Sequence, residues 1–185
     1  MVYKQNYYEN MDILKASFPN AWEKVAKMEA VLDKELIKMV TAKNSLPNLK
    51  VKDKYLHNQK NPRMEALAFI DQFKNMDNYA EILFYGIGLG YQLKAFMERY
   101  PDKPFSVYEP VPEIFYQFLV QADLQEYPPH LLRNIYIEEL PDDPNLFCFK
   151  LVKKIRSSIL IIDLPFYKEA FPEKRQAFFL SLRII

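Results

Sequence analysis

The chain has little glycine and cysteine, no long apolar run and almost no net charge, and each shortage excludes a class of protein. Only 3 of its 185 residues are glycine, and only a single residue, Cys148, is cysteine. A single cysteine cannot form a disulfide within the chain, so a reducing compartment, the cytoplasm, is expected. The N-terminal residues have no apolar signal core, and no run approaches the roughly 20 apolar residues that a membrane helix needs.

The balance of charge argues against general electrostatic partners. Lys and Arg number 25 against 24 Asp and Glu, for a formal net charge of +1. This balance gives no basis for binding nucleic acid or an anionic membrane. The only histidines, His57 and His130, lie far apart in the sequence, so no metal site is predicted. No Walker, G-x-S-x-G or H-E-x-x-H pattern occurs, and no catalytic residue is assigned within the chain.

What the chain has in plenty is apolar and aromatic residues. The hydrophobic fraction is 50% and the aromatic fraction 15%, which indicates a packed globule. Such aromatic content would also suit a homo-oligomer, although no interface can be assigned. We expect residues 1–60 to form a small appendage of two helices and a β-hairpin, and residues 61–185 to form the main domain.

The appendage is predicted from cap residues and a change of period. Asn10 and Asn20 are good N-cap residues, so a short helix is expected to begin after each. Residues 36–55 alternate with a period of two, which indicates a hairpin with Lys50, Lys52 and Lys54 on one face. That face could attract phosphate or an acidic partner. A solvated face that discourages edge pairing is the favoured interpretation.

The joint between the two parts is crowded with polar residues. Asn61 and Pro62 suit the start of a helix. The segment around this start contains His57, Lys60, Arg63 and Glu65. Capture of an anion there and a surface turn of mixed charge both remain open, with the turn favoured.

All three glycines lie within five consecutive positions, as Gly86, Gly88 and Gly90. They follow the apolar run at 82–85 and precede a helical pattern, after which a second apolar run ends at Glu109. This order is the layout of a nucleotide-binding half-fold: a strand, a glycine loop, a helix and a second strand with an acid at its tip. The stretch from 82 to 110 is therefore the centre of the predicted fold.

Two further strands are predicted, at 134–137 and 158–163, with helices between the strands. One of these helices is expected over 143–156, with Cys148 on its apolar stripe, and a final helix is expected near Pro172. Alternation of this kind predicts an α/β fold, a Rossmann-like parallel sheet of about four strands with helices on both faces. Ligands of such sheets bind beyond the carboxyl ends of the strands. The residues expected at that edge as candidates for binding a cofactor are Gly86, Gly88, Gly90, Tyr91, Glu109 and Asp163.

The glycine spacing admits two interpretations. It does not match the dinucleotide fingerprint, whose third glycine comes three positions after the second. It resembles the loop of S-adenosylmethionine-dependent methyltransferases, in which Glu109 would hold ribose hydroxyls, but Phe84 and Tyr85 stand where that family usually has an acid. Either the loop holds a nucleotide or an S-adenosylmethionine-like ligand, or its glycines only permit a tight turn and close packing.

Three phrases resemble the N-terminal region of the bacterial motility accessory factors: Tyr55–Ala66 (YLHNQKNPRMEA), Ile82–Leu93 (ILFYGIGLGYQL) and Phe105–Phe115 (FSVYEPVPEIF). Asn58 departs from the serine that is more frequent in this family. The resemblance implies a part in the glycosylation of flagellin with nonulosonic acids. It places the transferase chemistry in a central domain with a G-P-S-L-type loop, and the chain has no such loop.

The same resemblance implies that the chain is a piece of a longer protein. The piece would be the non-catalytic N-terminal domain of a glycosyltransferase, with flagellin and the missing catalytic domain as its partners. A methyltransferase-like or other nucleotide-dependent enzyme is the alternative that the glycine loop leaves open.

Overall fold

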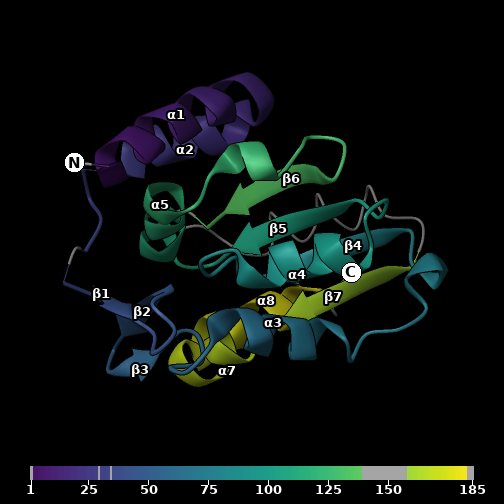
Figure 1. The fold of residues 1–185 in the computed structure, drawn as a ribbon. Coiled ribbons are helices and arrows are strands. Elements are labelled where there is room, and N and C mark those ends of the chain that lie inside the picture. The colour runs from purple at the N-terminus through teal and green to yellow at the C-terminus, as the bar shows by residue number, and fades with distance from the viewer. Residues whose placement is uncertain (1, 29, 34, 139–157, 183–185) are drawn as a thin grey trace.

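The computed structural model describes residues 2–28, 30–33, 35–138 and 158–182. They form an α/β structure with one parallel and one antiparallel sheet (Figure 1). In chain order the elements are α1 (Val2–Ser17), α2 (Pro19–Met28), β1 (Ile37–Thr41), β2 (Pro47–Val51), β3 (Lys54–Tyr55), α3 (Pro62–Ile70), η1 (Met76–Asn78), β4 (Glu81–Tyr85), α4 (Tyr91–Arg99), β5 (Phe105–Glu109), α5 (Pro112–Gln121), η2 (Leu124–Glu126), β6 (Leu132–Ile137), β7 (Ile159–Asp163), α7 (Pro165–Ala170) and α8 (Pro172–Ser181).

The main sheet has four parallel strands in the order β6-β5-β4-β7, which confirms the predicted fold. β4 comes first along the chain, and its neighbours are β5 on one side and β7 on the other. The direction in which strands are added therefore reverses beside β4. The edge of an open α/β sheet at such a reversal is where ligands usually bind.

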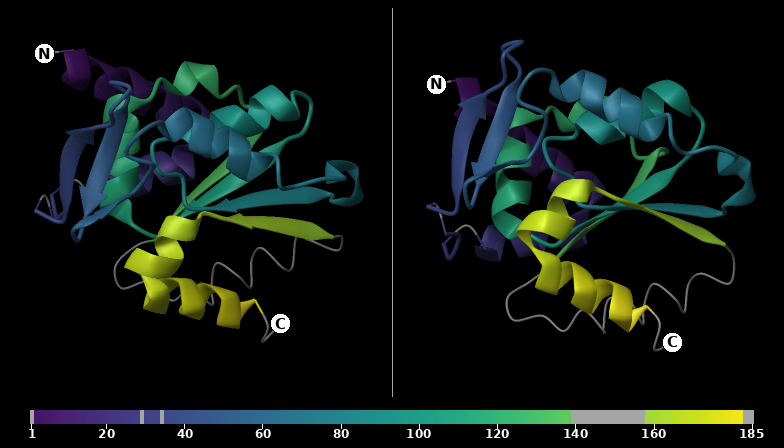
Figure 2. Two further views of the ribbon diagram at one scale, coloured as in Figure 1. Left: turned by 60° about the horizontal axis from the view of Figure 1, so that its bottom comes forward. Right: turned by 90° about the horizontal axis from the view of Figure 1, so that it is seen from below.

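Helices cover both faces of this sheet. Figure 2 shows α3 and α4 over one face and α7 and α8 against the other. Neighbouring residues of a strand point to opposite faces, and in β4 Phe84 packs on Phe96 of α4, with ring centroids 5.3 Å apart, while Tyr85 packs on Phe178 of α8 at 4.7 Å. Because both faces are covered, β4 and β5 read as nearly continuous apolar runs.

The smaller sheet is antiparallel, in the order β1-β2-β3. The predicted hairpin is confirmed, and a short third strand is added to it. Lys52 does not share a strand face with Lys50 and Lys54, because Lys52 and Asp53 have φ values of 47° and 67° and form the turn after β2. The Lys52 ammonium lies 4.5 Å from the ring centroid of Phe171, so the turn contacts the segment that joins α7 and α8.

The predicted caps at Asn10 and Asn20 are wrong, since both residues lie inside helices. Asn10 is buried at 1% exposure. Its amide nitrogen donates to the carbonyls of Leu119 and Ala122 at 2.8 and 2.7 Å, and its amide oxygen accepts from the Leu124 N–H at 2.8 Å. Asn10 therefore satisfies backbone groups at the end of another helix, α5, and fastens α1 to it.

The remaining sequence predictions fall partly on the described residues and partly outside them. A final helix near Pro172 is confirmed as α8, whereas α7 was not predicted. The predicted helix over 143–156, with Cys148, lies outside the described residues. The boundary near residue 60 stays a prediction. Among the described helices, none is both long and apolar enough to cross a membrane.

We expect Asn10→Ala to lower the free energy of unfolding by about 2–4 kcal/mol, because two buried carbonyls and one N–H would lose their partner. Urea unfolding followed by circular dichroism measures this. The control is Asn20→Ala, since Asn20 is exposed within α2 and should change stability by less than about 0.5 kcal/mol. Equal losses in the two variants would contradict the role given to Asn10.

Candidate functional site

The glycine loop lies at the carboxyl edge of the main sheet, where β4 ends beside β7. Gly86, Gly88 and Gly90 all have positive φ, at 94°, 54° and 82°. The loop is buried, and α4 begins directly after it. It therefore occupies the position at which a Rossmann-like fold would hold the phosphates of a ligand.

The N–H groups of this loop donate to side chains of the chain itself. The Ile87 N–H donates to Oε2 of Glu109 at 2.8 Å, the Gly88 N–H makes a longer contact of 3.4 Å with the Tyr167 hydroxyl, and the Leu89 N–H donates to Nε2 of His57 at 3.1 Å. In a phosphate-binding loop, successive N–H groups of this kind point at the ligand. Here a carboxylate, a phenol and an imidazole take its place.

Glu109 is the centre of this arrangement. Its side chain is fully buried and accepts from the Ile87 N–H, from the Val111 N–H at 2.9 Å and from the Tyr167 hydroxyl at 2.6 Å. Burial raises the pKa of Glu109 to about 7, while the three donors act in the opposite direction by favouring the carboxylate. In the structure Glu109 binds the glycine loop, and a role in holding ribose hydroxyls stays a prediction.

The glycines leave room for neighbouring side chains. A Cβ on Gly86 would lie 2.0 Å from Cε2 of Tyr167, and a Cβ on Gly88 would lie 2.8 Å from Cε1 of His57. Both distances are shorter than atoms tolerate. The missing Cβ atoms thus allow the approach of Tyr167 and His57, which agrees with the close-packing interpretation of the loop.

His57 is buried at 3% exposure, and it is held neutral. Burial lowers the pKa of His57 to about 3, so its Nε2 can accept the Leu89 N–H. Its Nδ1 has no hydrogen-bond partner in the described part of the chain, and lies 3.9 Å from the Glu65 carboxylate. Among the polar residues around the start of α3, His57 thus packs against the glycine loop.

Two of the predicted candidates serve other contacts. The Tyr91 hydroxyl donates to the Pro47 carbonyl at 2.8 Å, and its ring meets the His57 ring edge to face at 5.0 Å. Asp163 pairs through Oδ2 with Arg175 of α8, whose Nε and Nη2 each lie 2.6 Å away. Tyr91 therefore fastens the small sheet to the loop, and Asp163 fastens α8 to the tip of β7.

The sequence alone did not identify Tyr167 or Tyr127 as neighbours of the loop. Tyr167 follows the tip of β7, and the Tyr127 hydroxyl donates to the Gly90 carbonyl at 3.3 Å. The one available signal was that the chain segment after each strand of a parallel sheet returns to the same edge, where a large aromatic residue can fill a gap. Within the described ranges, no group of three His, Cys, Asp or Glu could hold a metal ion.

Comparison with known proteins agrees with this fold. The family described as Glycosyltransferase Maf N-terminal domain matches residues 33–158, more than half of the chain. The chain belongs to the Maf N-terminal domain family. The resemblance recognised in the sequence is therefore confirmed.

A solved Maf glycosyltransferase from Magnetospirillum magneticum AMB-1 has the same fold, with a TM-score of 0.61 and 16% sequence identity. The match covers 96% of this chain and 35% of that protein, so this Maf domain spans about a third of its solved relative. At this identity the similarity shows the fold alone. No match was found among curated proteins.

We expect Tyr167→Phe to lower the free energy of unfolding by about 1–3 kcal/mol, because Glu109 would lose a donor and the Gly88 N–H its contact. Tyr8→Phe is the control, since Tyr8 is 64% exposed and should show almost no change. Chemical unfolding of both variants measures the difference. An unchanged midpoint in Tyr167→Phe would show that the hydroxyl does not support the loop.

The opposed pKa shifts of His57 and Glu109 predict opposite pH dependences. The pKa of His57 falls from 6.5 to about 3, so its contribution to the free energy of unfolding is present above pH 6.5 and is lost as pH falls. The pKa of Glu109 rises from 4.5 to about 7, so its contribution to the same free energy is present below pH 4.5 and is lost as pH rises. Each slope is about 1.4 kcal/mol per pH unit.

The stability of the native chain minus that of His57→Gln should therefore rise from pH 4.5 to 6.5, and the difference for Glu109→Gln should fall over the same window. Urea unfolding at four pH values measures both differences, in which most other titrating groups cancel. Slopes of the same sign would contradict the burial of one of the two groups.

Proposed function

We propose that this Maf domain is the non-catalytic N-terminal domain of a cytoplasmic protein that glycosylates flagellin with a nonulosonic acid. Its part is to position flagellin and the catalytic domain for transfer. The observation that carries the proposal is the use of three successive loop N–H groups by Glu109, Tyr167 and His57. A loop that binds its own side chains can support a fold without binding a substrate.

A further feature supports this part. The fully buried Glu109 joins segments that follow β4, β5 and β7, so the loop is built into the core of the domain. Membership of the family supplies the link to glycosyl transfer, and the motility accessory factor resemblance supplies the link to flagellin.

The alternative is a domain that binds a nucleotide or S-adenosylmethionine. It is favoured by the position of Gly86, Gly88 and Gly90 at the carboxyl edge of the sheet, and by an acid at the tip of the second strand of the half-fold. It requires Tyr167 and Glu109 to leave the loop, because they occupy its donors. Such a movement would displace two buried side chains, joined by a 2.6 Å hydrogen bond, from the core.

Calorimetry distinguishes these functions. We expect no heat of binding when residues 1–185 are titrated with S-adenosylmethionine, NAD or a CMP-sugar, and we expect Gly88→Ala to lower stability because its Cβ would meet the His57 ring. Lys38→Ala, a change at an exposed residue of β1, serves as the matched control. Saturable binding of any of the three ligands, lost in Gly88→Ala, would favour the nucleotide-binding alternative.

The role in glycosylation is tested in the full-length protein. We expect a form lacking residues 1–185 to leave flagellin unmodified in cells, and residues 1–185 alone to transfer no sugar, with intact-mass spectrometry of flagellin as the measurement. Normal modification by the truncated form would show that the domain is not required. Turnover by the isolated chain would show that it is an enzyme.

A further inference from the structure

A cavity separate from the glycine loop lies between α2 and the start of α5. It has a volume of about 200 Å³ and is lined by Lys24, Lys27, Met28, Val31, Leu32, Pro112 and Glu113. Pro112 and Glu113 follow β5, and Lys24 donates to the carbonyl of Ile137, the last residue of β6, at 3.0 Å. The cavity therefore opens at the carboxyl edge of the sheet, over β5 and β6 and away from the filled position beside β7.

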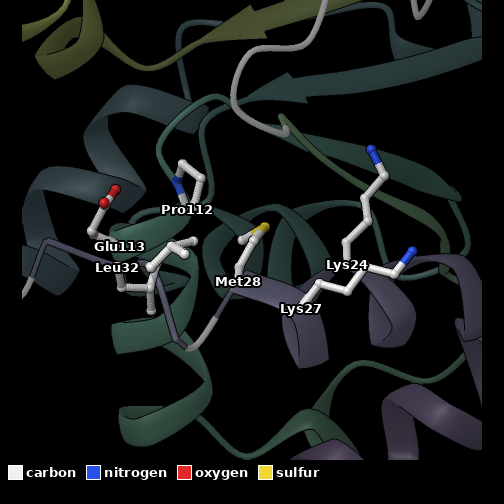
Figure 3. Close-up of a pocket in the computed structure, with 7 residues that line it drawn as sticks. Lys24, Lys27, Met28, Leu32, Pro112 and Glu113 are labelled. Atoms are coloured by element: carbon white, nitrogen blue, oxygen red, sulfur yellow. The ribbon is translucent and has the colours of Figure 1, made fainter.

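The middle of the cavity is apolar. Figure 3 shows Met28 between the two lysines on one side and Leu32 and Pro112 on the other. Val31 stands at the rim with 71% of its surface exposed. An apolar cavity of about 150 Å³ can hold benzene, so the space fits one small ring or a branched aliphatic group.

The charges around the cavity are unequally distributed. Lys24 and Lys27 extend from α2 at one end, and Glu113 lies at the other (Figure 3). The Lys24 ammonium already donates to the Ile137 carbonyl, whereas Lys27 is exposed and forms no ion pair with the described residues. Glu113 accepts the Asp33 N–H at 3.2 Å, which ties the rim to α5. An anionic group is thus favoured at the lysine end only.

We propose that this cavity binds a small organic anion, with its carboxylate beside Lys27 and its apolar body against Met28, Leu32 and Pro112. The size of the cavity selects one ring or short branched chain, and the Lys27 ammonium selects negative charge. The site uses none of the residues that fill the glycine loop. It is therefore independent of the scaffold function proposed above, and either can fail without the other.

Three ring compounds of equal size test the proposal on residues 1–185 at pH 7: benzoate, neutral benzamide and cationic benzylamine. We expect benzoate to bind with a Kd of about 1 mM, benzamide about three- to five-fold more weakly, and benzylamine not measurably. Protein-observed NMR measures the affinities. The shifts caused by benzoate should be confined to residues that line the cavity.

Two variants and a control make the test specific. Lys27→Gln should lower benzoate affinity to that of benzamide, and Val31→Trp should block all binding, because an indole at this exposed rim covers the opening. Lys38→Gln removes an exposed lysine of β1 and should change nothing. Equal affinities for benzoate and benzamide, binding that survives Val31→Trp, or no binding at about 10 mM benzoate would each overturn the proposal.

Discussion

The buried carboxylate of Glu109 is the constraint on which the carboxyl edge of the sheet depends. It accepts from the loop after β4, from the turn after β5 and from the helix after β7, so one side chain joins the ends of three strands. A buried charge without partners is strongly unfavourable. The sequence around it supplies three donors within 2.9 Å, and these fix the glycine loop as a consequence.

This network changes what the loop can do. In a nucleotide-binding Rossmann fold, the loop N–H groups and the acid after the second strand stay open for phosphate and ribose. In this Maf domain the Ile87 N–H donates to Glu109 directly, Tyr167 and His57 take the next two N–H groups, and the glycines accommodate the two rings. The layout of a ligand-binding fold is retained, while its polar groups stabilise the fold itself. Fold and function are separable in this way because function resides in the open groups of a site.

The cavity between α2 and the start of α5 lies on the same edge of the sheet. There α1 packs against α5, and α2 packs against α5 and β6; Asn10 and Lys24 fasten the two helices through backbone carbonyls. Both contacts join residues more than one hundred positions apart. The N-terminal helices thus take part in shaping the edge where a ligand of this fold class would bind.

The sequence by itself determined the main sheet, because the runs at 82–85 and 105–109 must be buried on both faces, because the apolar run at 158–163 supplies another strand, and because glycine, Asn61 and Pro62 mark where loops and helices meet. It also placed Glu109 at a strand tip. Only the tertiary structure decided which way the polar groups face. Asn10 has the local preference of a cap, yet three distant backbone groups hold it inside a helix. Tyr167 contacts Gly88 of the glycine loop, which lies 79 positions away in the sequence, and no local pattern encodes such a pairing.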